Sequence, residues 1–210
     1  MSRGLSFRQI PTIGDLYQRG VLRRLNDKNA NATKERFPSV ARLLDRVSLY
    51  QGDITKLDVH AIVNAANGSL LDGDGADGAI HRAAGPQLLK ECRTLKGCQT
   101  GDAKITRGYN LPARHVIHTV GPVYSGTAKV QLVCDQLASC YTRSLHVAAH
   151  HSLTQIAFPA ISTGVHNFPI MSATHIALNA VRLFLESEEE INFERVVTSS
   201  YDRTLKINII

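Results

Sequence analysis

The chain has 210 residues, of which 43% are hydrophobic and 20% are charged, and this suffices for one domain with a full core. No apolar run approaches the roughly 18 residues of a membrane span, and the start carries no secretory apolar segment. We therefore expect a soluble intracellular protein of the cytoplasm or nucleus that does not enter a membrane. A mitochondrial location is the alternative, because the start carries arginines and few acidic residues.

The net charge of +6 belongs to the N-terminal part of the chain. The first 50 residues hold ten Lys or Arg and four Asp or Glu, and subtracting these from the totals of 24 and 18 leaves 14 of each. Such a basic arm can contact nucleic acid, but aromatic residues are not interleaved with its charges. We expect a solvated or packed arm, and nucleic acid is not an expected partner.

Cysteine and histidine spacing gives no metal or disulfide pattern. No cysteine pair forms CxxC, and none is followed by a histidine at zinc-finger spacing. Three histidines near the end of a predicted helix are better explained by the cation preference of a helix C-terminus than by zinc. We expect reduced thiols, no metal and no cofactor. The residues concerned are Cys92, Cys98, Cys134, Cys140, His146, His150 and His151.

Residues 1–45 are predicted to form a basic N-terminal extension, partly helical, ahead of a domain over residues 46–210. Residues 1–12 have the composition of irregular structure. Residues 16–25 have a helical spacing of apolar side chains that Gly20 interrupts. Pro38 is suited to start a short helix that reaches Leu44.

Predicted strands and helices alternate along the domain, which is typical of an α/β fold with a parallel sheet. In such sheets the ligand lies beyond the carboxyl ends of the strands. The predicted strands cover 47–50, 61–63, 103–109, 116–120, 155–159 and 193–200, and the predicted helices cover 76–92, 127–150 and 171–184.

The stretch from Ala61 to Gly85 has the order strand, glycine loop, helix. An apolar run over 61–63 predicts the end of a buried strand, and Asn64 and Asn67 follow it. Glycines and a helix N-terminus together suit an anion, because free N–H groups and the helix dipole carry partial positive charge. On the glycines alone, a loop with only a structural role is as good an interpretation as an anion site. The glycines fit neither GxGxxG nor GxxxxGK[ST].

A series of motifs follows in one order: QGDIT at 51–55, NAAN at 64–67, GADG at 75–78, IHRAAGP at 80–86, TGDAKIT at 100–106, VIHTVGP at 116–122 and FPAISTGV at 158–165. Together they resemble the macrodomain family, and within it the MacroD-type ADP-ribose hydrolases. The resemblance covers about residues 47–201. It implies a three-layer α/β/α macrodomain with a mixed, mainly parallel sheet, preceded by an N-terminal extension, and we expect a monomer.

The resemblance also implies a binding site for ADP-ribose. Asp53 would accept a hydrogen bond from the adenine amino group, and the backbone N–H of Ile54 would also contact adenine. Alternatively, Asp53 caps the turn that follows it. Tyr201 would lie near adenine or be a packed surface tyrosine. The diphosphate would lie between two loops, 72–76 and 162–167. Their binding residues would be Gly73, Asp74, Gly75, Ala76, Ser162, Thr163, Gly164, Val165, His166 and Asn167.

Three residues are the candidates for catalysis. Asn67 suits a hydroxyl of the distal ribose, because an amide both donates and accepts. Asp77 would orient or deprotonate water, and its alternative is a charge favoured by the helix dipole. His81 lies one helical turn further on the same face and would orient Asp77 or the ribose. A substrate phosphate is the alternative base. His118, inside a predicted strand, is expected to be a core histidine.

Two loops depart from the family pattern. Asp74 replaces a glycine, and a carboxylate about 5 Å from a phosphate charge costs under about 1 kcal/mol in water and ~3 kcal/mol at an effective dielectric near 20. Affinity would fall by up to about a hundredfold unless Asp74 points outward. His166 stands where the family has Phe or Tyr, and when protonated it would add an attractive charge. Asn167 stands for a glycine and tolerates a left-handed backbone.

The resemblance therefore implies a hydrolase that removes mono-ADP-ribose from acidic side chains of proteins and deacetylates O-acetyl-ADP-ribose. Its partners would be ADP-ribose, ADP-ribosylated proteins and O-acetyl-ADP-ribose. The alternative is a reader module that binds ADP-ribose without significant turnover. A third reading, a nucleic-acid-binding protein that uses the basic arm, would require steep salt dependence of RNA binding.

Overall fold

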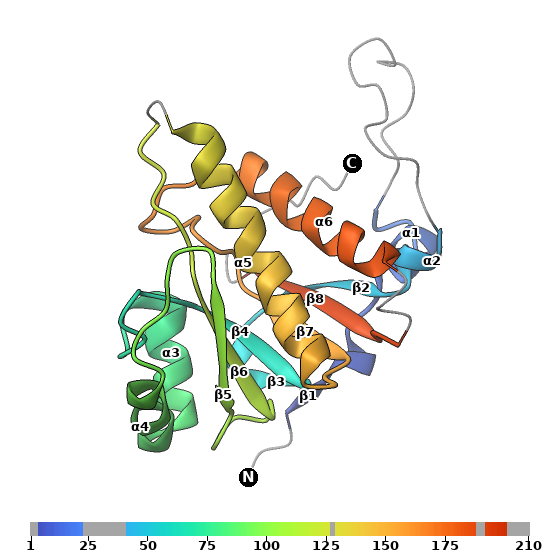
Figure 1. The fold of residues 1–210 in the computed structure, drawn as a ribbon. Coiled ribbons are helices and arrows are strands. Elements are labelled where there is room, and N and C mark those ends of the chain that lie inside the picture. Colours follow the sequence, from blue (N-terminus) through green and yellow to red (C-terminus); the bar gives the residue numbers. More distant parts are fainter. Residues whose placement is uncertain (1–3, 23–40, 127–128, 188–191, 201–210) are drawn as a thin grey trace.

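The structure, a computed structural model, describes residues 4–22, 41–126, 129–187 and 192–200. A six-stranded sheet runs through its centre in the order β2-β8-β7-β4-β6-β5 (Figure 1). β5 is antiparallel to β6, and the other neighbouring pairs are parallel. The strands are β2 Val47–Gln51, β4 Ala61–Ala66, β5 Ala103–Arg107, β6 His115–Val120, β7 Gln155–Phe158 and β8 Arg195–Ser200.

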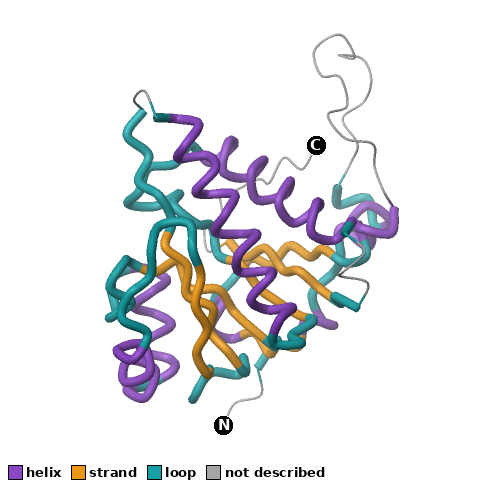
Figure 2. Tube along the Cα trace, viewed as in Figure 1, coloured by secondary structure: helices purple, strands orange, loops and turns teal. Residues whose placement is uncertain are grey.

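Helices cover both faces of this sheet (Figure 2), which confirms the predicted three-layer α/β/α fold with a mixed, mainly parallel sheet. α5 (Val130–His150) and α6 (Ile170–Glu186) pack against each other on one face. α3 (Gly75–Ala84) and α4 (Pro86–Thr94) lie on the other face.

Alternation along the buried strands divides the core into two clusters. In β4, Ala61 and Val63 join the cluster under α5 and α6, whereas Ile62 and Ala66 join the cluster under α3 and α4. Successive strand side chains point to opposite faces, so both faces of this sheet are apolar. By the same alternation, Asn64 points to the α3 side.

The described part of the N-terminal extension packs against the sheet edge formed by β2 and β8. Phe7 and Ile10 are buried, and the Arg195 guanidinium lies 5.4 Å from the centre of the Phe7 ring. Arg195 also donates to Ser48 Oγ at 2.8 Å and to the carbonyl of Ile10 at 3.5 Å. These contacts tie the extension to the domain.

The extension contains more regular structure than its sequence predicts. β1 (Leu5–Ser6) pairs with β3 (Leu57–Asp58), and Phe7–Gln9 forms a 3-10 helix, so the irregular assignment of residues 1–12 is wrong. α1 (Ile13–Gln18) starts earlier than expected, because Thr12 and Asp15 form a capping box. α2 (Ala41–Leu44) lies in the second predicted helix. α1 also ends at Gln18, so the predicted helix over residues 19–22 is wrong, and these residues form turns and bends instead. The remaining parts of the two predicted helices, 23–25 and 38–40, lie outside the described residues.

Several predicted boundaries in the domain are also wrong. The strands predicted over 103–109 and 193–200 are each two residues shorter, as β5 and β8. The strand that was expected to end at Val63 continues as β4 to Ala66, so Asn64 lies inside it. The single helix expected over 76–92 is two helices, α3 and α4. Gly85 has φ +82 and Pro86 cannot donate a backbone hydrogen bond, so the helix must break there.

The parallel strands β4, β6 and β7 all end at the same edge of the sheet. The glycine loop follows β4, and the predicted second loop follows β7. No helix in the described ranges is long and apolar enough to cross a membrane.

Candidate functional site

Asn67 shapes the glycine loop from within. Its Oδ1 accepts hydrogen bonds from the backbone N–H groups of Ser69 at 3.0 Å and Leu70 at 3.1 Å. Its Nδ2 donates to the carbonyl of Asp72 at 2.8 Å. Leu70 is fully buried and anchors the loop. The amide therefore has a loop-forming role that spacing alone does not show, and its contact with ribose stays a prediction.

Glycine is needed at two points because the loop crosses directly over Asp77. A Cβ at Gly73 would lie 2.9 Å from Asp77 Oδ2 and 3.2 Å from Asn67 Nδ2. A Cβ at Gly78 would collide with the carbonyl of Gly73. The sequence-predicted phosphate residues of this loop are exposed, which leaves them accessible to a ligand. They are Gly73, Asp74, Gly75 and Ala76.

Asp77 is a buried carboxylate at the foot of this loop, 3% exposed. Its Oδ1 accepts a 2.6 Å hydrogen bond from Asn64 Nδ2 and lies 3.4 Å from His81 Nε2. Its Oδ2 is buried and has no partner among the described residues. A buried acceptor without a partner is costly, so this atom is suited to a water or ligand hydrogen.

The environment raises the pKa of Asp77. Burial is the main cause, because it disfavours the charged form, and the nearby Asp72 acts in the same direction. The hydrogen bond from Asn64 and the charge of His81 oppose this shift. A carboxylate with a raised pKa is a stronger base toward water.

His81 lies on the same face of α3 as Asp77, as the i, i+4 spacing predicts. It is 6% exposed, and its Nε2 has no hydrogen-bond partner within the described part of the chain. Its ring lies 6.2 Å from that of His118, centre to centre. The spacing prediction for the Asp77–His81 pair is therefore confirmed.

His118 is the core histidine that the sequence predicts. It is fully buried in β6, and its Nδ1 lies 3.1 Å from Asn64 Nδ2. Its Nε2 lies 2.9 Å from Thr106 Oγ1 and 3.7 Å from Cys92 Sγ. Burial, and then the charge of His81, lower the pKa of His118 to about 3.

Two groups of side chains have donor atoms close enough to share a metal ion. His81, Cys92 and His118 form one group, and Asp72, Asp77 and His81 form the other. Both nitrogens of His118 already face hydrogen-bond partners, so metal binding there would break those bonds. The expectation of no metal stays a prediction.

The second loop, after β7, is a tight turn with two residues in the left-handed region. Ser162 has φ +64 and Asn167 has φ +55, so the predicted tolerance of Asn167 for this backbone is confirmed. The Asn167 N–H donates to the carbonyl of Gly164 at 2.9 Å, and the carbonyl of His166 accepts from the Tyr124 N–H at 2.8 Å. Thr163 Oγ1 lies 3.4 Å from the carbonyl of Ala160.

Ser162 also joins the loops after β6 and β7. Its Oγ is buried without a partner in the described ranges, and a Cβ at Gly121 would collide with it. Gly121 lies in the VIHTVGP motif, and its close contact with Ser162 was not predicted from the sequence. β4 has β6 and β7 as its two neighbours, so the glycine loop and the second loop leave the same edge of the sheet and can face one ligand.

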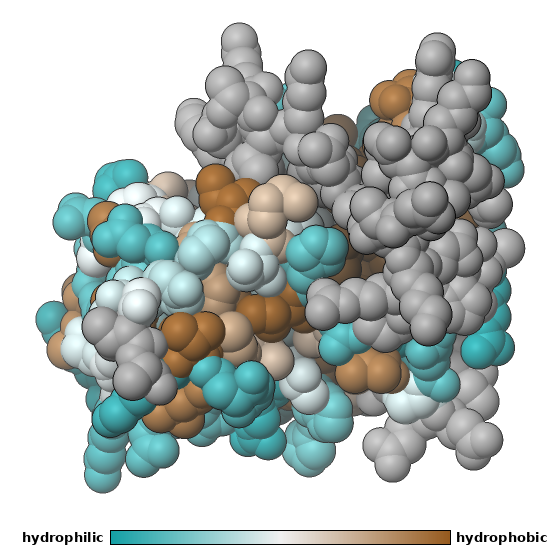
Figure 3. All heavy atoms as spheres, turned by 90° about the horizontal axis from the view of Figure 1, so that it is seen from above, coloured by the Kyte–Doolittle hydropathy of each residue, from teal (hydrophilic) through white to brown (hydrophobic). Residues whose placement is uncertain are grey.

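Exposed hydrophobic side chains surround this edge. Figure 3 looks onto the top of the molecule as drawn in Figure 1 and shows hydrophobic patches between hydrophilic ones. Val165, at the tip of the second loop, is 88% exposed. The other exposed hydrophobic residues of this region are Leu71, Val123, Val130, Leu132, Ile170 and Met171.

The structure shows Asp53 in its capping role. Asp53 Oδ1 accepts from the Thr55 backbone N–H at 2.9 Å and from Thr55 Oγ1 at 2.7 Å, at the start of the 3-10 helix Ile54–Lys56. Ile54 is buried. The contacts of Asp53 and Ile54 with adenine stay predictions. Tyr201 lies outside the described residues.

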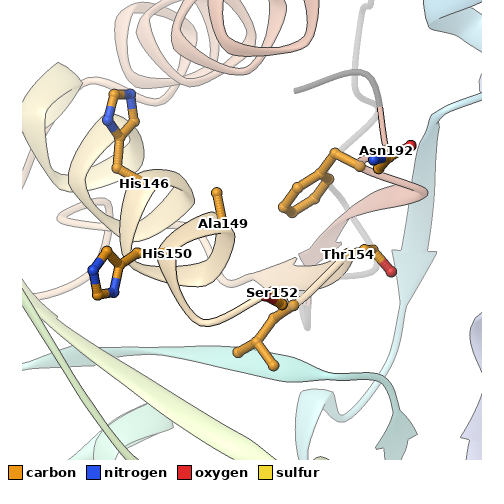
Figure 4. A pocket seen from close by; sticks show the side chains of 8 residues that line it. His146, Ala149, His150, Ser152, Thr154 and Asn192 are labelled. Carbon is orange, nitrogen blue, oxygen red and sulfur yellow. The ribbon is translucent and has the colours of Figure 1, made fainter. Parts of the chain in front are cut away.

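A separate hollow of about 570 Å³ lies where α5 ends and β7 begins, at the end of the sheet opposite to the glycine loop and the second loop. Figure 4 shows His146 and His150 on one side of it and Thr154 and Asn192 on the other. The His150 and His151 rings lie 5.4 Å apart. This hollow contains none of the predicted site residues.

The Macro domain family profile matches residues 63–177, which carry the glycine loop, Asp77, His118 and the second loop. A macro domain-containing protein of Mesorhizobium japonicum is 55% identical over 163 residues, covering 78% of this chain and 90% of that protein. The chain therefore belongs to the macro domain family.

Two further relatives carry more specific names. ADP-ribose glycohydrolase MACROD1 of Bos taurus is 54% identical over 149 residues, covering 71% of this chain and 46% of that protein. The crystal structure of a Trypanosoma brucei macrodomain in complex with ADP-ribose has a TM-score of 0.76 and 37% identity, covering 96% of this chain and 73% of that one. The predicted resemblance to the MacroD-type branch is thus confirmed.

Proposed function

We propose that this protein is an ADP-ribose-binding hydrolase that releases mono-ADP-ribose from acidic side chains of proteins. The observation that supports this most directly is the state of Asp77. One carboxylate oxygen is fixed by Asn64, and the other is buried, lies under Gly73 and has no partner in the described ranges. The names of the MACROD1 relative and of the ADP-ribose complex support the same assignment.

Asp77 acts as the base toward water in this proposal. Burial raises its pKa, so the carboxylate takes a proton from water more readily than an exposed one does. The ester and one water then give free ADP-ribose, the carboxylate of the target side chain and one proton, which Asp77 accepts. An acyl ester is a favourable substrate, because its carboxylate leaving group is stable. The same chemistry would remove the acetyl group of O-acetyl-ADP-ribose.

The two loops would hold the diphosphate from both sides with backbone N–H groups, as helix N-termini and glycine loops do elsewhere. Asn67 would meet the distal ribose, and Asp53 with Ile54 would meet adenine. His166 would stack on ribose. Location in the cytoplasm or nucleus, with the mitochondrion as the alternative, and a monomeric state remain part of the proposal.

The test follows release of ADP-ribose from a peptide that is mono-ADP-ribosylated on glutamate. Wild type is expected to release it, and Asp77→Ala is expected to lose release while calorimetry still detects ADP-ribose binding. Asp135→Asn is the matched control, because Asp135 is an exposed carboxylate on α5 that bonds Gln131. Release that survives in Asp77→Ala would make a substrate phosphate the base, and binding without release in wild type would make the protein a reader.

A further inference from the structure

A chain of polar side chains runs from Asp77 into the apolar core under α3 and α4. Asn64 of β4 and His118 of β6 are direct neighbours in the sheet register, and both are fully buried. Their flanking residues on this face belong to the apolar cluster. Polar side chains in the middle of two adjacent buried strands are costly unless they are hydrogen-bonded.

The direction of each hydrogen bond in this chain is fixed by Asp77. An ionised carboxylate accepts and does not donate, so Asn64 must turn its NH₂ toward Asp77 Oδ1. The same NH₂ lies 3.1 Å from His118 Nδ1, so its second hydrogen goes to that nitrogen. This orientation leaves Asn64 Oδ1 without a partner in the described part of the protein. The two hydrogen bonds that the Asn64 NH₂ donates therefore determine how the amide is oriented.

His118 is thereby held in one protonation state. Because Nδ1 accepts from Asn64, the ring hydrogen lies on Nε2, which faces Thr106 Oγ1 at 2.9 Å. A second proton on Nδ1 would face the NH₂ of Asn64. The groups around the ring are Asn64 on β4, Thr106 on β5, Cys92 on α4 and His81 on α3. Among these, a charged His81 would further oppose a charge on His118.

We propose that Asn64 and His118 are positioning residues for Asp77. His118, as the neutral Nε2–H tautomer, holds the Asn64 amide, and Asn64 in turn fixes Asp77 Oδ1. The carboxylate is then held with Oδ2 under Gly73, toward the loop that would carry the ribose. No proton moves along these hydrogen-bonded side chains during turnover. The proposal deepens the hydrolase assignment and rests on it for its kinetic consequences.

The kinetic test compares Asn64→Ala, His118→Leu and His118→Asn with wild type. Asn64→Ala is expected to lower kcat about tenfold or more, because a hydrogen bond to a charged group is lost, with little change in KM. The acidic limb of its pH profile is expected to move to higher pH, because the hydrogen bond from Asn64 lowers the pKa of Asp77 and partly offsets the larger effect of burial. His118→Leu is expected to act in the same direction.

His118→Asn is the rescue variant, because its side-chain oxygen can accept from Asn64 near the position of Nδ1. It should recover most of the kcat that His118→Leu loses. Thr119→Val is the matched control, since Thr119 is also buried in β6 but its hydroxyl bonds the carbonyl of Asp102. Thr119→Val is expected to be less stable, because a buried hydrogen bond is lost, but should keep the wild-type pH profile.

If the folded Asn64→Ala and His118→Leu variants keep the wild-type kcat and the wild-type acidic limb, Asn64 and His118 have a purely structural role. This result would overturn the proposal. So would a loss in His118→Asn equal to that in His118→Leu. If Asn64→Ala does not fold, the His118 pair decides the outcome by the same criteria.

NMR of the wild-type protein separates this proposal from the hydrolase assignment, because it needs no turnover. Nitrogen shifts are expected to show His118 neutral with its hydrogen on Nε2 at neutral pH. Carbon shifts of the carboxylates are expected to show Asp77 titrating at higher pH in His118→Leu than in wild type. A hydrogen on His118 Nδ1, or an Asp77 titration that is the same in His118→Leu as in wild type, would refute the positioning role even if ADP-ribose is released. If the expected shifts are observed but no ADP-ribose is released, only the hydrolase assignment is refuted.

Discussion

Asp74 is the residue whose effect on affinity the structure now bounds. It precedes the first residue of α3, its side chain makes no capping hydrogen bond, and the residue is exposed. At about 5 Å a phosphate charge is repelled by about 0.8 kcal/mol in water and by ~3 kcal/mol at an effective dielectric near 20. Because Asp74 is exposed, the value for water applies. Removing its charge should tighten ADP-ribose binding about fourfold.

The assay is calorimetric titration with ADP-ribose for wild type, Asp74→Asn and Asp74→Gly. Asp74→Asn removes the charge and keeps the side-chain size, so it separates charge from backbone effects. The gain should shrink at high salt, because exposed charges are screened. Stability should fall by about 0.3–1 kcal/mol, since a negative charge at a helix N-terminus is lost. Unchanged or weaker binding by Asp74→Asn, or a gain that does not depend on salt, would refute this reasoning.

Three further outcomes follow from the contacts of the site. Gly73→Ala would place a methyl group 2.9 Å from Asp77 Oδ2, so release of ADP-ribose should fall at least about tenfold in kinetic assays, and wild-type release would contradict the proposed position of water. Asp77→Asn should match or exceed the wild-type melting temperature at neutral pH. Burial raises the pKa of Asp77, so ionisation of this carboxylate destabilises the folded wild-type protein as the pH rises through that pKa. A lower melting temperature for Asp77→Asn would contradict this. The free energy of unfolding of wild type should fall relative to that of His118→Asn by up to ~1.4 kcal/mol per pH unit as the pH falls from 6.5 toward about 3. The reason is that His118 binds a proton in the unfolded protein but not in the folded one. Urea titrations measure this difference, and parallel pH curves for the two proteins would contradict it.

The fold was largely predictable because its signals are local. Buried apolar runs, the alternation of strands with amphipathic helices and the glycine loop are all visible within short windows of sequence. The i, i+4 spacing of Asp77 and His81 likewise predicts their contact without tertiary information. The break at Gly85 and Pro86 was also marked locally, but the apolar spacing on either side of it favoured one continuous helix.

The role of Asn64 could not be predicted, because its partners are distant in sequence. An asparagine after an apolar run normally marks the end of a strand. Here it stays inside β4 because Asp77, 13 residues away, and His118, 54 residues away, satisfy its NH₂. Asn67 was expected to face a ligand, yet its amide also builds the loop that we propose as part of the ligand site. Hydrophobic periodicity contains neither kind of information.

Release of ADP-ribose from a peptide mono-ADP-ribosylated on glutamate, measured for wild type beside Asp77→Ala, tests the central claim most directly. We expect wild type to convert the peptide to free ADP-ribose and unmodified glutamate, and Asp77→Ala to bind ADP-ribose without releasing it. A wild-type protein that binds ADP-ribose and releases none, or that neither binds nor releases it, would contradict the hydrolase assignment.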